Sequence, residues 1–251
     1  KFLNQGVKMT APNAPSNFTS IPILFTATPD APLQETLTQF DLIHRNTDKN
    51  TTITGHYKHR VDLVYGPPNN RTYYEGVYNV LPVAVVEPVP FRVKLHTPST
   101  PIVRGGSLNL KVEIIRDANF TKDVVVKILT KPSGIGAKSN VKISSKDSIG
   151  YYPLTANGGT PIGEWEIGVQ AEAPADDGGN MLAASNFIKL KVEEPYLSVK
   201  INMAAVERGK NGEMICDLDI TRPFEGLAKA DLKGLPPFAV TEQVEFDANS
   251  S

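Results

Sequence analysis

The chain has 251 residues, of which 40% are hydrophobic and 21% are charged. The hydrophobic content is sufficient for buried cores. The 26 basic and 27 acidic residues nearly cancel in charge, so the composition gives nucleic-acid binding no electrostatic support. No apolar run approaches the roughly 18 residues that a membrane-spanning helix requires. The length predicts one to three domains of about 100 residues each.

Residues 1–87 are predicted to form the second half of a β-sandwich module that carries a long insertion. The apolar run at residues 21–29 resembles a later run at residues 165–171, which also leads to a proline, and the run before Pro88 resembles the run before Pro195. The insertion between these matches is predicted to contain three strands. These strands cover residues 37–44, 56–65 and 73–80.

The insertion also contains the candidate binding residues, which are Tyr65, Tyr73, Tyr74 and Tyr78. Exposed aromatic rings can bind sugars, and tyrosine is enriched at protein interfaces. The alternative is that these side chains pack against the sandwich as ordinary strand residues. An exposed row of rings would support binding, whereas burial of the rings would remove the reason for it.

Residues 88–194 are predicted to form one complete sandwich. Apolar and polar residues alternate with a period of two in short runs, which is typical of strands with one buried face, and Gly, Pro and Asn separate the runs. About seven short strands at this spacing indicate a two-sheet sandwich. Trp165 is expected in the core, and a short helical turn is expected at residues 180–184. The runs lie at residues 91–95, 108–114, 124–128, 141–143, 165–169 and 188–192.

Residues 195–251 repeat the first half of this unit, with offsets between 103 (Val141 and Val244) and 107 (Pro88 and Pro195). A third module would therefore begin here. Its missing strands are expected either from further chain or from neighbouring molecules, because half a sandwich cannot bury its inner face alone. The alternation at residues 214–220, which match residues 108–114, places the single cysteine, Cys216, in a core.

The two module junctions, Glu87-Pro88 and Glu194-Pro195, leave almost no linker. Proline restricts its own backbone and that of the residue before it. We therefore expect a stiff, end-to-end arrangement of immunoglobulin-like, Greek-key β-sandwich modules, in an all-β chain.

Motifs for catalysis or metal binding are weak. His56 and His59 would point to opposite faces of a strand, which argues against a shared metal. Asp176 and Asp177 are a weak calcium candidate, with a hairpin turn as the alternative. The chain contains neither a serine-nucleophile elbow nor a phosphate-binding loop, so we expect no enzyme, no cofactor and no catalytic residue.

Several segments resemble tandem immunoglobulin-like modules of large exported bacterial proteins, which often occur near pre-peptidase C-terminal (PPC) domains. The segments are residues 61–70, 81–91, 103–112, 152–158 and 221–226. The resemblance implies a modular β architecture and a secreted, periplasmic or cell-surface location. It carries over no activity and no catalytic residue.

Two functions are compatible with these observations. The first is a non-catalytic structural or adhesive spacer, or an assembly segment, of a larger exported cell-envelope or extracellular protein. Its partners would be other modules of the same parent chain, further copies of itself, or a surface protein or glycan. The second is a glycan- or protein-binding accessory module of a secreted multidomain enzyme. A hydrolase is a third and weaker hypothesis.

Overall fold

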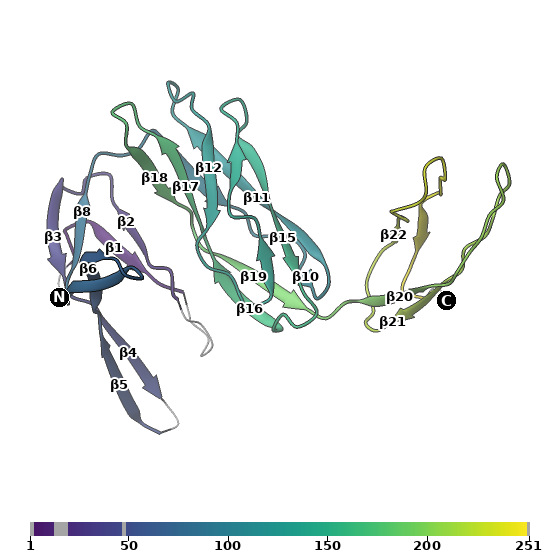
Figure 1. Ribbon diagram of the computed structural model, residues 1–251, viewed down its shortest axis with the longest axis horizontal. Coiled ribbons are helices and arrows are strands. Elements are labelled where there is room, and N and C mark those ends of the chain that lie inside the picture. The colour runs from purple at the N-terminus through teal and green to yellow at the C-terminus, as the bar shows by residue number, and fades with distance from the viewer. Residues whose placement is uncertain (1–2, 13–19, 47–48, 250–251) are drawn as a thin grey trace.

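The computed structural model describes residues 3–12, 20–46 and 49–249. Within these ranges the chain contains 23 β-strands and no helix, so the predicted all-β class is confirmed. Figure 1 shows three parts in chain order. The N-terminal segment (residues 3–87) and the C-terminal segment (residues 195–249) lie on opposite sides of a central sandwich (residues 88–194).

Three sheets enclose the core of the central sandwich. Two have four strands, in the orders β13-β15-β11-β9 and β14-β12-β17-β18, and the third has three strands, in the order β10-β19-β16. The pairing is antiparallel except between β10 and β19. The strands are β9 (Phe91–Leu95), β10 (Ile102–Val103), β11 (Ser107–Arg116), β12 (Val124–Ile128), β13 (Ile135–Ala137), β14 (Val141–Ile143), β15 (Ile149–Ala156), β16 (Gly163–Ile167), β17 (Val169–Pro174), β18 (Asn180–Ala184) and β19 (Ile188–Glu193).

The alternation in the sequence determines which side chains enter this core. In β11, Leu110, Val112 and Ile114 are buried, while the residues between them face outward or are half-buried. Trp165 is 6% exposed and belongs to the core, as predicted. All fully packed members of the hydrophobic cluster lie between Phe91 and Val192, so the main core of the described chain lies within the central sandwich.

Two predicted elements of the sandwich are wrong. The single strand at residues 165–169 is divided at Gly168, and its halves β16 and β17 belong to different sheets. A side-chain carbon added at Gly168 would lie 3.0 Å from the ring of Phe187, so the bend at this position leaves little room for a side chain. Residues 180–184 form the edge strand β18 instead of a helical turn, because pairing with β17 overrides the helical preference of Met, Leu and Ala.

The N-terminal segment consists of four two-stranded sheets, β1·β2, β3·β8, β4·β5 and β6·β7. The Asn4 side chain connects two of these strands by donating to the carbonyl oxygens of Gln34 (3.0 Å) and Val83 (3.5 Å). The predicted strand at residues 37–44 is divided between β3 and β4, and β5 was not predicted. The strands are β1 (Val7–Thr10), β2 (Leu24–Ala27), β3 (Gln34–Thr38), β4 (Asp41–Asn46), β5 (Thr51–His56), β6 (His59–Gly66), β7 (Arg71–Tyr78) and β8 (Leu81–Val85).

The C-terminal segment consists of two hairpin-like ladders, β20 (Leu197–Ile201) with β21 (Cys216–Ile220), and β22 (Ala228–Ala230) with β23 (Val244–Phe246). No residue of this segment belongs to the buried hydrophobic cluster. Cys216 is exposed, so its predicted burial is wrong. The reason is that, in the part of the chain that the structure describes, no second layer covers the face on which it lies.

Both C-terminal ladders have counterparts in the central sandwich. β20 pairs with β21 as β9 pairs with β11, and β22 pairs with β23 as β12 pairs with β14. The residues opposite Leu95 and Ile201 are Val112 and Cys216, respectively. Cys216 thus corresponds to Val112, two residues away from the match predicted along the sequence. A two-residue displacement preserves the alternation, because the side-chain period of a strand is two.

The first N-terminal ladder also has a counterpart. β1 pairs with β2 as β13 pairs with β15: Val7 lies opposite Ala27, and Ile135 lies opposite Ala156. The run at residues 21–29 is therefore a counterpart of β15, and its predicted likeness to residues of β16 and β17 is wrong. A proline follows both the run at residues 21–29 and the run at residues 165–171. Proline marks strand ends generally, so a shared proline does not show that two strands correspond.

Candidate functional site

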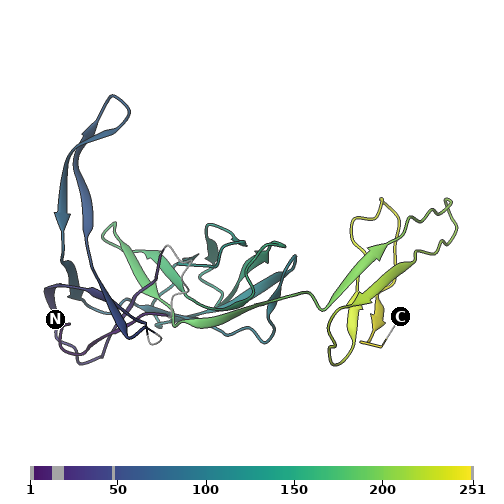
Figure 2. The same ribbon diagram turned by 90° about the horizontal axis from the view of Figure 1, so that it is seen from below.

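The four candidate tyrosines lie on the β6–β7 hairpin, which Figure 2 shows as a long blue arm projecting from the N-terminal segment. All four are exposed: Tyr65 by 66%, Tyr73 by 59%, Tyr74 by 64% and Tyr78 by 46%. The alternative prediction, that these rings pack against the sandwich, is therefore wrong.

The tyrosines do not form one regular row along the hairpin. Tyr74 and Tyr78 are four residues apart on β7 and share one face, whereas the register between β6 and β7 shifts at Tyr73, between the pairs Val64–Tyr74 and Tyr65–Thr72. The Tyr78 ring covers Gly76, where an added side-chain carbon would lie 2.9 Å from the ring. The Tyr73 hydroxyl donates to the carbonyl oxygen of Pro67, 2.5 Å away, and this bond holds the ring over the hairpin turn.

Apolar and charged side chains accompany the rings. Val64 and Val77 are 53% and 52% exposed, and Arg60 forms an ion pair with Glu75 across the two strands at 3.4 Å. An isolated two-stranded hairpin is marginally stable in water. The arm thus presents an exposed surface of mixed apolar and charged character.

The remaining candidates from the sequence are separate from this arm. Asp176 pairs with Lys122, and the Asp177 carboxylate accepts from the backbone of Gly179 at 3.1 Å, within the turn that joins β17 to β18. His56 lies 2.7 Å from Asp41, whereas His59 stacks on a tyrosine ring. Across the described ranges, no cluster of three or more His, Cys, Asp or Glu side chains could hold a metal ion.

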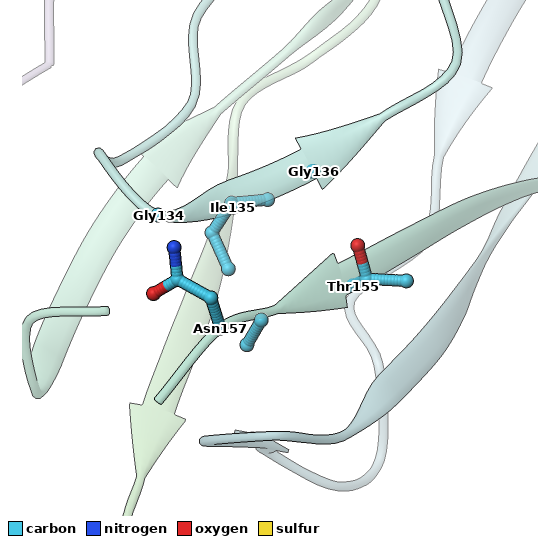
Figure 3. Close-up of a pocket in the computed structure, with 6 residues that line it drawn as sticks. Gly134, Ile135, Gly136, Thr155 and Asn157 are labelled. Carbon is cyan, nitrogen blue, oxygen red and sulfur yellow. The ribbon is translucent and has the colours of Figure 1, made fainter. Parts of the chain in front are cut away.

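A shallow hollow lies between β13 and β15 (Figure 3). Its lining contains no ionisable side chain, so these residues provide no acid, base or nucleophile with a tuned pKa. The lining residues are Gly134, Ile135, Gly136, Thr155, Ala156 and Asn157.

A polar cluster, which we call the junction cluster, lies where the central sandwich meets the C-terminal segment. Glu193 ends β19, and its carboxylate accepts hydrogen bonds from Arg222 Nη1 (3.0 Å) and from the Tyr196 hydroxyl (3.2 Å). The Arg222 guanidinium also lies over the Tyr196 ring, 4.8 Å from its centre. Because Arg222 follows β21, these contacts connect the two parts directly.

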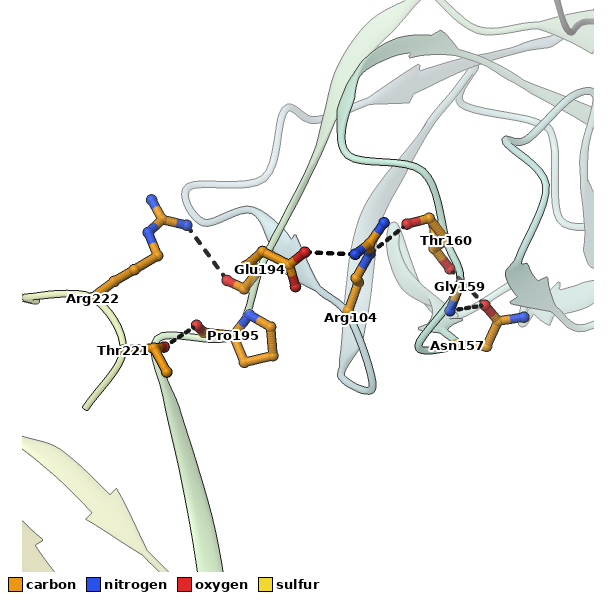
Figure 4. Close-up of polar contacts among 8 residues, drawn as sticks. All are labelled: Arg104, Asn157, Gly159, Thr160, Glu194, Pro195, Thr221 and Arg222. Carbon is orange, nitrogen blue, oxygen red and sulfur yellow. Dashed lines mark hydrogen bonds and ion pairs between the residues drawn. The ribbon is translucent and has the colours of Figure 1, made fainter. Parts of the chain in front are cut away.

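Backbone contacts complete the junction cluster (Figure 4). The Thr221 hydroxyl donates to the carbonyl oxygen of Pro195 at 2.8 Å. On the other side of the proline, Arg104 donates to the Glu194 carboxylate (2.5 Å) and to the carbonyl oxygen of Thr160 (2.7 Å). The proline is thus fixed from both sides, and rotation about the short linker would break several hydrogen bonds at once.

Charge stabilises Glu193 in its ionised form. Hydrogen bonding to Lys191 lowers the pKa of Glu193 below 4.5, and the contacts with Arg222 and Tyr196 lower it further, while partial burial opposes them. The Glu193 side chain is only 10% exposed, so solvent screens its pairs less than those of a surface residue.

Comparison with known proteins adds no assignment: no protein-family model matches the chain, and no curated protein matches it. Among the residues that the structure describes, there is no helix with the length and apolarity needed to cross a membrane.

Sequence reasoning found the exposed tyrosines but missed the junction cluster. The two proline junctions indicated a stiff joint. They did not indicate that Arg222 and Arg104 reach the glutamates beside the second proline, because these partners are 29 and 90 residues apart in sequence.

Proposed function

We propose that this chain is a non-catalytic structural segment of a larger exported protein, built from immunoglobulin-like, Greek-key sandwich modules joined end to end. Residues 1–87, 88–194 and 195–251 would belong to three successive modules. The location would be periplasmic, secreted or at the cell surface, as the resemblance to exported bacterial modules implies.

The junction cluster is the observation that carries this proposal. A flexible linker would allow the two parts to move independently, which is the usual expectation for domains with small interfaces. Here the linker is reduced to one proline, and Arg222 connects the parts on either side of it by donating to the Glu193 carboxylate and to the carbonyl oxygen of Glu194 (Figure 4 shows the latter contact). A spacer needs this property, because its length is useful only if its joints resist bending.

Small-angle X-ray scattering of the Arg222→Ala variant tests the proposal. The expected result is a broader distribution of overall dimensions, because the cation that connects the two parts is lost. The matched control is Lys189→Ala, which removes an exposed ion pair with Glu164 inside the sandwich and should leave the distribution unchanged. Identical scattering for wild type and Arg222→Ala would contradict the stiff-spacer proposal.

The exposed tyrosines favour a second candidate function, a binding module for a surface glycan or protein. Tyr74 and Tyr78 share a face, so their joint replacement by alanine should reduce binding on a glycan array or to cell-wall material. Tyr73→Ala, at the ring that is bonded to Pro67 in the hairpin turn, is the matched control. Equal binding by all variants would remove this candidate.

A further inference from the structure

In the described part of the chain, two stretches that extend from strands have an edge without a strand partner. Residues 20–23 precede β2, and residues 211–215 precede β21. Among the described residues, β2 pairs only with β1, and β21 pairs only with β20. Each strand therefore has one unpaired edge, and backbone donors and acceptors on such an edge are available to another strand.

The counterparts of these two stretches pair with each other in the central sandwich. β11 and β15 form a seven-residue ladder from Ser107 opposite Thr155 to Glu113 opposite Ile149. β15 lies between β13 and β11, so it is a central strand of its sheet. The N-terminal segment contains the pair that corresponds to β13·β15, and the C-terminal segment contains the pair that corresponds to β9·β11. Among the described residues, neither segment contains a counterpart of the β11·β15 ladder, which would join the two pairs.

The correspondence on the N-terminal side extends beyond the strands. The Thr28 amide donates to Gly6 (2.9 Å) as the Asn157 amide donates to Gly134 (3.1 Å), and both glycines have positive φ. The Ala31 amide then closes a turn by donating to the carbonyl oxygen of Thr28. In the sandwich, the corresponding turn is closed by a hydrogen bond to the carbonyl oxygen of Asn157. β3 pairs with β8 in the register of β16 with β19.

The correspondence on the C-terminal side is equally detailed. The Asn202 amide donates to Ile215 (3.0 Å) as the His96 amide donates to Lys111 (3.1 Å). The turns at Gly105 and Gly209 also match, since both glycines have positive φ. These shared hydrogen bonds fix the register in which a missing strand would have to be added.

We propose that the N-terminal segment of one copy of this chain pairs with the C-terminal segment of a second copy, through an antiparallel ladder that reproduces β11·β15. Transferring the β11·β15 register places Cys216 of one copy opposite Ile21 of the other, and Met214 opposite Ile23. All four side chains would lie on the core-facing side. In the single chain, Ile21, Ile23 and Met214 are 36–45% exposed, and Cys216 is exposed as well. Pairing would bury them.

The occupant we infer is a second copy, because the strand edge that each segment leaves open is complementary in register to the edge that the other segment offers. Figure 1 shows the two segments on opposite sides of the central sandwich. The contact is head-to-tail, joining different surfaces of the two copies, and contacts of this kind produce filaments or closed rings. The inference rests on the proposed structural function and names the partner in its assembly.

The native cysteine allows a direct test of the register. Opposite residues of an antiparallel pair have Cα atoms about 4.5–5.5 Å apart, which lies within the range of a disulfide. In the Ile21→Cys variant, mild oxidation by copper(II)-phenanthroline should join the new thiol to Cys216 of the next copy. Two protons are released to water and two electrons pass to copper. Non-reducing electrophoresis should show a ladder of multimers, and mass spectrometry should identify the peptide containing residues 21 and 216.

The matched control is Ser20→Cys, whose thiol would be on the opposite face of the ladder. It should give roughly tenfold less of the cross-linked peptide, because the two side-chain vectors diverge. Equal yields from both variants, or no multimer from Ile21→Cys, would overturn the proposal. The oxidised wild-type chain has a single thiol and can form nothing larger than a disulfide-linked dimer.

A second pair of variants tests the same ladder without a covalent cross-link. Met214→Asp places a charge on the core-facing side, and sedimentation velocity should show loss of association. Ile215→Asp places the same charge at the position of Lys111, which is exposed in the sandwich, and should associate like wild type. A wild-type chain that sediments as a monomer at all concentrations would overturn the inference. It would leave the stiff-spacer proposal intact, because the scattering test of Arg222→Ala concerns a single molecule.

Discussion

The Leu95→Ala substitution tests whether the central sandwich contains the only assembled core of the described chain. Leu95 is 1% exposed and lies opposite Val112 on β11. The substitution removes three carbons, worth about 2.4 kcal/mol at about 0.8 kcal/mol per buried methylene, and leaves a cavity. The expected loss of unfolding free energy is therefore about 3 kcal/mol. The backbone of Leu95 keeps its two hydrogen bonds to Asn186, each 3.0 Å, so packing alone is lost.

Trp165 provides the assay, because it is the only tryptophan of the chain and lies in the central core. Urea unfolding followed by its fluorescence should show a lower midpoint with an unchanged slope. The matched control is Ile201→Ala at the corresponding position of the C-terminal segment, where the side chain is 55% exposed. It should shift the free energy by less than about 0.5 kcal/mol. If both variants lowered the midpoint equally, the two parts would share one core and the reasoning would fail.

Three further outcomes are expected. Asn186→Ala leaves the amide and carbonyl of Leu95 without partners and should lower the unfolding free energy by about 1–3 kcal/mol in the same fluorescence assay. Because the pKa of Glu193 is lowered, its contribution to the junction is complete above pH 4.5 and is lost as the pH falls through that lowered pKa. Scattering should broaden as the pH falls through the lowered pKa, and Glu193→Gln should already be broad at pH 7. Gly134→Ala should destabilise more than Gly178→Ala in the fluorescence assay: both have positive φ, but only at Gly134 would the added carbon meet other atoms, the nearest at 2.6 Å.

The fold was predictable where burial and alternation agree. The strands around Val93, Leu110 and Leu190 were all predicted, because each has a buried and an exposed face in a completed core. Cys216 has the same alternation but is exposed. The pattern records which face a strand is suited to bury, and only the presence of an opposing layer determines whether it does so.

The candidate site was predictable in a similar, partial way. The clustering of tyrosines was visible in the sequence, but the register shifts between β6 and β7 beside Tyr73 were not, because strand alternation alone does not indicate a bulge. The contacts of Glu193 depend on segments far apart in the sequence, so no local pattern indicates them. The carboxylates of the adjacent Glu193 and Glu194 pair with different arginines, Arg222 and Arg104 respectively.

The route of the chain through the central sandwich has a mechanical consequence. The chain enters at β9 and leaves from β19 at the other end, next to β16 and β10 (Figure 1). A pull transmitted through the neighbouring segments therefore acts along β19. Its hydrogen bonds to β16 are perpendicular to the strand, so the five residue pairs from Gly163–Val192 to Ile167–Ile188 bear the load together. Under tension the sandwich fails by shearing a whole ladder, which is much harder than opening one bond after another.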